Sequence, residues 1–270
     1  MPPATPLNIA IVVVGLTAIV LNWMPTLDAA GTAYLSDAMA GNLVIYASAR
    51  ALNGIISVIQ SIEVGVSLGA GVAISLGEVL DPLNDLIERF SSFILVVLAA
   101  IGLQKLILAA SVSLVMKGLV TVAIIGGVMA ALLAPTRFTW LKGLAGAIVL
   151  TRFIFILQVG VLAVADHTYF DERDAQARAA LSLAQQELGE LRSRYLAAAR
   201  EDGIFSGAVD TVLRLIGDDE SAGVADIAAN AVVELMVILL VRTIILPLLF
   251  LWLLYLGTRY LLSNQWHPTG

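Results

Sequence analysis

The chain has 270 residues, of which 59% are hydrophobic and 13% are charged. Soluble domains carry about 25% charged residues, so this chain has too little polar surface to stay in water as a monomer. Its net charge of −6 gives no basic surface for nucleic acid, and the lack of cysteine excludes disulfides, thiolate metal sites and cysteine nucleophiles. We therefore expect an integral membrane protein without cofactors, with the lipid bilayer as its main partner.

Four apolar segments predict membrane-spanning helices, because about 20 apolar residues are needed to cross about 30 Å of hydrocarbon. The first is bounded by Pro6 and Pro25, and it lacks the basic start of a signal peptide, so we expect residues 1–24 to be a retained helix. The segments are Leu7–Met24, Phe90 to about Leu103, Leu144–Val164 and Ala231–Leu256.

Two further segments leave the number of crossings open between four and six. Leu106–Ala134 is apolar apart from Lys117, and it is either one span or a bent hairpin that enters and leaves on one side. Leu43–Ile62 has a polar stripe at helical spacing, which is typical of a helix that packs in a bundle, lines water or lies at the interface. The stripe consists of Asn42, Tyr46, Arg50, Asn53, Ser57 and Gln60.

A β-hairpin is predicted between this stripe and the second span. Apolar residues alternate with small ones over Val64–Leu76, around Gly69-Ala70-Gly71. We expect a loop containing Pro82 to follow, so that residues 25–89 form an extramembrane or interfacial helix and a hairpin.

Residues 166–230 form the one clearly water-soluble segment, with 13 acidic residues against 6 arginines. Apolar residues recur there in heptads, which predicts either coiled-coil packing, between chains or in a hairpin, or a long amphipathic helix packed on its own chain. We expect self-association, and the candidate oligomerisation residues are Leu181, Leu188, Leu191 and Tyr195.

The predicted fold class is an all-α polytopic membrane protein with four to six transmembrane helices, a short β-hairpin insertion and an acidic helical periplasmic segment. Its expected parts are residues 1–24, 25–89, 90–165 (transmembrane or re-entrant helices), 166–230, and 231–270 (the last transmembrane helix with a short cytoplasmic tail).

Two arginines lie in the middle of apolar segments, Arg152 in the third and Arg242 in the fourth. A charge at mid-helix costs about 2.5–3.5 kcal/mol on insertion scales, so it usually faces a bundle interior or a water-filled path. The nearest intramembrane acid is Glu234, too far along the helix from Arg242 for a direct pair, which suggests an anion, a lipid phosphate or water as partner. The alternative is snorkelling, or hydrogen bonds to backbone carbonyls and Gln158. The candidate permeation residues are Arg152, Arg242, Arg50, Asn53, Ser57 and Gln60.

Signals for enzymatic chemistry are weak. Gly65-Val66-Ser67-Leu68-Gly69 matches the nucleophile-elbow pattern, but that motif needs a strand, a turn, a helix and a histidine base. His167 stands beside acidic residues at the end of a span, where a capping role is more common than metal binding. We expect neither an enzyme nor a metal site.

Three runs in the first half of the chain are similar to an uncharacterised family of bacterial inner-membrane proteins. They are Ser48–Asn53, Ile56–Val58 and Gly77–Ser91, so the resemblance is sharpest over residues 48–91. It implies a bacterial inner membrane and no particular reaction, and it carries over no functional residues.

The leading functional hypothesis is a homo-oligomeric inner-membrane channel, permeable to anions through rings of arginine. The first alternative is a non-enzymatic scaffold that binds a partner through its periplasmic helices. The second is a transporter with an arginine site at the midplane, although no inverted repeat is visible.

The charge distribution predicts the topology. Arg137, Lys142 and Arg259 flank the spans and favour the cytoplasm, which places the C-terminus inside and residues 166–230 in the periplasm. Reporter fusions at Gly217 and Gly270 are expected to give periplasmic and cytoplasmic signals, respectively. A cytoplasmic signal at Gly217 would contradict the topology.

Overall fold

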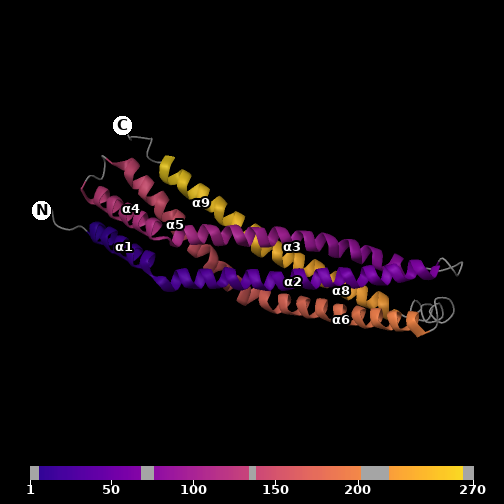
Figure 1. Ribbon diagram of the computed structural model, residues 1–270. Helices are drawn as coiled ribbons and strands as arrows, with labels where there is room; N and C mark the ends of the chain where they lie inside the picture. The colour runs from indigo at the N-terminus through magenta and orange to yellow at the C-terminus, as the bar shows by residue number, and fades with distance from the viewer. Residues whose placement is uncertain (1–5, 68–75, 134–137, 202–218, 264–270) are drawn as a thin grey trace. The chain divides into compact units, whose positions relative to one another are not determined.

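The computed structural model describes residues 6–67, 76–133, 138–201 and 219–263. Within these ranges nearly every residue is helical, as Figure 1 shows. Short π-helical turns, Asp166–Phe170 and Val241–Ile245, join α5 to α6 and α8 to α9. The helices are α1 (Pro6–Trp23), α2 (Pro25–Ser67), α3 (Leu76–Val112), α4 (Leu114–Leu133), α5 (Thr139–Ala165), α6 (Asp171–Glu201), α8 (Asp219–Leu240) and α9 (Leu246–Ser263).

The predicted β-hairpin is not found in the part of the chain that the structure describes. α2 continues to Ser67 and α3 begins at Leu76, so both ends of the predicted hairpin are helical. Residues 68–75 lie outside the described residues. Alternation over a few residues predicts a strand, but it does not distinguish a strand from a helix of small and β-branched residues. The predicted loop containing Pro82 is likewise wrong, since Pro82 lies inside α3, at its seventh residue, where the helix forgoes one backbone hydrogen bond.

Two helix breaks divide long apolar segments. Pro25 starts α2 directly after Met24, because proline is favoured at the first position of a helix but cannot continue the one before it. Ser113 separates α3 from α4, and its hydroxyl accepts a hydrogen bond from the Met116 N–H at 3.3 Å, as a helix N-cap does. The ambiguous segment Leu106–Ala134 is therefore the end of α3 followed by α4.

The chain divides into two compact units. Unit 1 comprises Met1–Ala38, Ala100–Ala165 and Arg242–Gly270. Its helices approach closely where glycine leaves room: a Cβ at Gly15 would lie 2.7 Å from Val128 Cγ2, and one at Gly257 would lie 2.5 Å from Leu150 Cδ2. Gly15 lies against Val128 and Asn22 against Thr121, so α1 is antiparallel to α4, and Gly257 against Leu150 with Gly146 against Leu261 makes α9 antiparallel to α5. The consecutive helices α4 and α5 pack along each other as a hairpin. The start of α1 and the end of α9 therefore lie at the same end of unit 1.

The outer surface of unit 1 is apolar. Val115 and Leu133 of α4 are 81% and 76% exposed, and α1 and α9 also expose many large apolar side chains. Such a surface suits lipid rather than water. Among the described residues, six helices are long and apolar enough to cross a membrane, so we regard the chain as a multi-pass membrane protein.

Unit 2 comprises Met39–Ala99 and Asp166–Val241 and is a bundle of α2, α3, α6 and α8. Each helix buries apolar residues at alternating spacings of three and four, the pattern of coiled-coil cores. In α2 these are Ile45, Ala49, Leu52, Ile56 and Ile59, and in α3 Leu80, Leu83, Ile87, Phe90, Ile94 and Val97. Alanines at the same positions of α6 and α8 let these two helices approach closely; they are Ala177, Ala184, Ala228 and Ala231.

The candidate oligomerisation residues take part in this packing within one chain. Leu181 and Leu188 are buried in unit 2, Leu191 is half-buried, and the side chain of Tyr195 lies outside the described residues. The heptads of α6 therefore need no second chain to cover Leu181 and Leu188. Self-association stays a prediction, and native mass measurement in mild detergent tests it.

Shortening Leu188 should destabilise unit 2, because its side chain is 1% exposed. We expect Leu188→Ala to lower the free energy of unfolding by about 2–5 kcal/mol, as is usual for a buried leucine. Leu183→Ala, on the exposed face of the same helix, is the matched control and should change it by no more than about 0.5 kcal/mol. Equal effects in an SDS unfolding titration would contradict the packing of α6.

A buried ionic cluster as candidate functional site

Unit 1 contains a carboxylate held between two cations. Asp28, in the first turn of α2, is 2.7 Å from Lys117 Nζ through Oδ2 and 2.5 Å from Arg152 Nη2 through Oδ1. Arg152 stands at the middle of α5, and Lys117 lies one turn into α4. All three are buried, and the Arg152 side chain is only 1% exposed.

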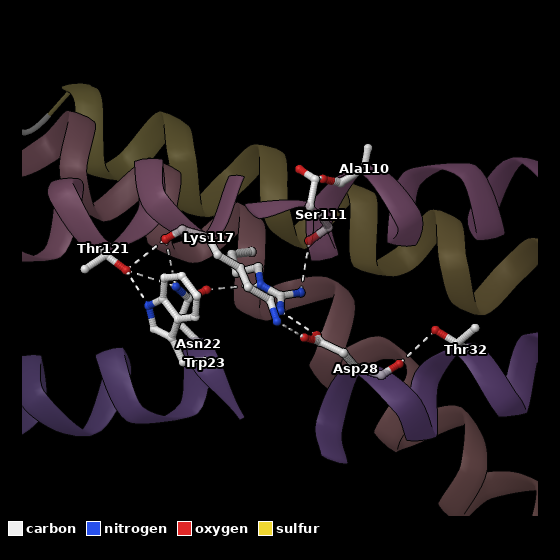
Figure 2. Close-up of polar contacts among 10 residues, drawn as sticks. Asn22, Trp23, Asp28, Thr32, Ala110, Ser111, Lys117 and Thr121 are labelled. Carbon is white, nitrogen blue, oxygen red and sulfur yellow. Dashed lines mark hydrogen bonds and ion pairs between the residues drawn. The ribbon is translucent and has the colours of Figure 1, made fainter. Parts of the chain in front are cut away.

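Neutral side chains complete the surroundings of Arg152. Its Nε donates to Asn22 Oδ1 at 3.3 Å, and its Nη1 donates to Ser111 Oγ at 3.0 Å. Asn22 in turn donates to the Lys117 carbonyl oxygen at 3.0 Å, and Figure 2 shows it lying between α1 and α4. The guanidinium is therefore held by hydrogen bonds in three directions, which fixes its orientation.

Aromatic and hydroxyl groups border the cluster. The Trp23 Nε1–H donates to Thr121 Oγ1 at 2.9 Å, and Lys117 Nζ lies 5.9 Å from the centre of the Trp23 ring. At that distance the ring face attracts the ammonium group. The Lys117 position is therefore set by Asp28 on one side and Trp23 on the other (Figure 2).

The helix breaks explain why these residues meet. Asn22 and Asp28 lie on either side of the break before Pro25, and Ser111 and Lys117 lie on either side of the break at Ser113. A break frees backbone groups and brings a helix N-terminus to this level on each of the two chain segments. The Asp28 carboxylate suits the N-terminus of α2, where the helix dipole favours negative charge.

The cluster has an excess of positive charge. Asp28 supplies one carboxylate, whereas Lys117 and Arg152 supply two cations. A buried charge without a counter-charge is costly, so the arrangement favours a further anion. It is unsuited to a metal ion, which needs several carboxylate or neutral ligands.

A second polar group in unit 1 involves the π-helical turn. The Gln104 amide donates to the Thr243 carbonyl oxygen at 3.4 Å, and the Gln158 amide donates to Gln104 Oε1 at 3.3 Å. A π-helical turn displaces carbonyls from their usual partners, and here Gln104 provides a substitute. Gln158, one predicted partner of Arg152, therefore bonds to Gln104.

A half-open apolar cavity of about 340 Å³ adjoins the cluster, and Met116 and Leu119 of its lining are partly exposed at the surface of unit 1. Arg152, Ser111 and Thr151 contribute its polar groups, and the other lining residues are apolar, among them Ile148 and Phe155. Arg152 and Ser111 are both buried, so this cavity brings hydrogen-bond donors to an otherwise apolar space.

The expectation that the mid-helix arginines lack a matching acid is wrong for Arg152, because Asp28 contacts it directly. Asp28, Asn22 and Ser111 were not among the candidate residues. The available signal is an aspartate between Leu27 and Ala29, three residues after the proline that ends the first span, but no local spacing relates position 28 to position 152.

The other candidate permeation residues lie elsewhere. Arg242 is half-buried in the π-helical turn Val241–Ile245. The polar stripe belongs to unit 2, where Arg50 is exposed and Ser57 donates to the Asn53 carbonyl oxygen of its own helix at 2.8 Å. Gln60 donates to Asp81 Oδ1 at 2.6 Å, which ties α2 to α3. Within unit 1 the side chain of Arg152 contacts Asn22, Ser111 and Asp28, and all three differ from these candidate residues.

Comparison with known proteins gives no match to a protein-family model, to a curated protein or to a solved structure. The function of the chain is therefore inferred from the geometry and charge of the site itself.

Removing the carboxylate should destabilise unit 1, because Lys117 and Arg152 would remain buried without their counter-charge. We expect Asp28→Ala to lower the free energy of unfolding by about 3–5 kcal/mol. Asp37→Ala, at an exposed position of the same helix, is the control and should cost no more than about 0.5 kcal/mol. If both variants unfold alike in an SDS titration, the ion pairs contribute nothing.

Proposed function

We propose that the chain is a membrane transport protein in which a small anion binds at the cluster of Asp28, Lys117 and Arg152. The observation that supports this most directly is the excess of one positive charge in the interior of unit 1. An ionisable group inside a membrane protein is expensive to keep, and a functional role is the default explanation.

The helix breaks support the same proposal. In transporters, discontinuous helices direct their positive N-terminal ends at anionic groups near the midplane. Here α2 begins at Pro25 and α4 at Leu114, so two helix N-termini are at the level of the cluster. Dipoles and side chains then favour the same sign of ligand. Helix ends joined by a single residue also provide hinges for opening and closing the site.

The burial of Arg152 favours transport over an open channel. A ring of arginines that sets selectivity must face a water-filled path, whereas Arg152 is bonded to Asp28, Asn22 and Ser111. A homo-oligomeric channel would need these contacts to open. The scaffold alternative draws on a different feature, the polar exposed face of α6, and is compatible with a transport site in unit 1.

Flux measurements in proteoliposomes test the proposal, with chloride and radiolabelled methanesulfonate as probes because both remain charged. We expect the wild-type protein to carry at least one of them, and Arg152→Gln to reduce that flux at least tenfold. Arg259→Gln, at an exposed position of α9, is the matched control and should keep the wild-type rate.

Arg152→Lys keeps the positive charge and should retain part of the flux, and the free energies of unfolding of the Arg152→Lys and Arg152→Gln proteins separate loss of the site from loss of folding. Flux that is equal in the wild-type and Arg152→Gln proteins would contradict a site at this arginine. If Arg242→Gln shifts the reversal potential while Arg152→Gln does not, the path lies at Arg242 and the proposal fails.

A further inference from the structure

We propose that the cavity beside Arg152 binds the apolar body of a monoanionic organic molecule whose charged group contacts Arg152 and Ser111. This inference rests on the proposed function and specifies its substrate class. The cavity lies between the end of α3, the start of α4 and the middle of α5, and all its lining residues belong to unit 1.

The charged group of the ligand is inferred from donors that the cluster leaves available. Arginine has five N–H donors, and three of those of Arg152 are used by Asn22, Ser111 and Asp28. The Ser111 oxygen accepts from Arg152, so its own O–H must point elsewhere. Both side chains are more than nine-tenths buried and line the cavity. Two buried donors beside an excess positive charge match one carboxylate or sulfonate.

The apolar body is inferred from the rest of the lining. Apart from Arg152, Ser111 and Thr151, the cavity is lined by aliphatic, methionine and aromatic side chains. The Thr151 hydroxyl already donates to the Ala147 carbonyl oxygen at 2.8 Å. An inorganic anion would leave this apolar surface unused, whereas a short hydrocarbon chain would cover it.

The volume of the cavity indicates the size of the apolar body that would fill it. Its volume is about 340 Å³. At roughly 30 Å³ per water-sized group, this space holds on the order of ten non-hydrogen atoms. A chain of about six carbons with one acidic group matches the volume and the charge.

Calorimetric titration of the full-length protein in lipid nanodiscs tests this inference with three probes. Hexanesulfonate has the charge and the apolar body, methanesulfonate has the charge alone, and hexanol has the body alone. We expect hexanesulfonate to bind at least tenfold more tightly than either of the others. If methanesulfonate binds as tightly, the cavity takes no apolar body and the inference fails.

Two neighbouring residues of α5 provide a matched pair of cavity-filling variants. Ile148 lines the cavity beside Arg152, whereas Val149 lines a separate cavity of about 420 Å³ between α1, α4 and α5. Both are half-buried. Ile148→Trp should weaken hexanesulfonate binding at least tenfold, and Val149→Trp should leave it within twofold of wild type. Equal affinities of the two variants for hexanesulfonate would show that it does not bind in the cavity beside Arg152.

The test also separates this inference from the proposed function. Arg152-dependent chloride flux without preferential hexanesulfonate binding would overturn the apolar subsite and leave the anion site standing. Loss of hexanesulfonate binding in nanodiscs that contain phosphatidylglycerol, compared with phosphatidylcholine alone, would assign the site to a lipid headgroup and overturn the inference.

Discussion

Arg152 stands at the middle of a 27-residue apolar helix, and Asp28 comes within ion-pair distance of it. Other features of unit 1 follow from the need to place a carboxylate beside this buried arginine. For Asp28 to reach Arg152, α2 must begin beside α5, and the break before Pro25 allows that start. For Lys117 to reach the same carboxylate, α4 must begin at the same level, and the Ser113 cap allows it. The ion pairs and the helix breaks therefore depend on each other.

The two units are stabilised by different interactions. In lipid the hydrophobic effect contributes little to the association of helices. The association of helices in unit 1 therefore depends on close packing at small residues and on buried polar contacts. Gly15 and Gly257 provide the former, and the Asp28 cluster provides the latter. Unit 2 is held by heptads of apolar residues, as a soluble bundle is. The stability of unit 1 and the stability of unit 2 should therefore respond to different changes in conditions.

Features that depend on local spacing could be predicted from the sequence. The third apolar segment, Leu144–Val164, lies within α5, the first segment ends at Pro25, and the heptads at Leu181 and Leu188 face a core. The pairing of Asp28 with Arg152 joins positions 124 residues apart, and no periodicity encodes such a contact. Val64–Ser67 was assigned to a strand because alternation over a few residues does not distinguish a strand from a helix of small and β-branched residues. The heptads also left open whether they pack within or between chains, because the pattern is the same in both cases.

A double-mutant cycle between Asp28 and Arg152 tests the central claim most directly, because it isolates the interaction of the two side chains. The free energy of unfolding would be measured for the wild type, Asp28→Asn, Arg152→Gln and the double variant in one lipid mixture. Direct contact between the two charges predicts a coupling of about 0.5–3 kcal/mol, with the double variant more stable than the sum of the single losses implies. Additivity within about 0.3–0.5 kcal/mol would show that the two residues do not interact and would contradict the buried cluster.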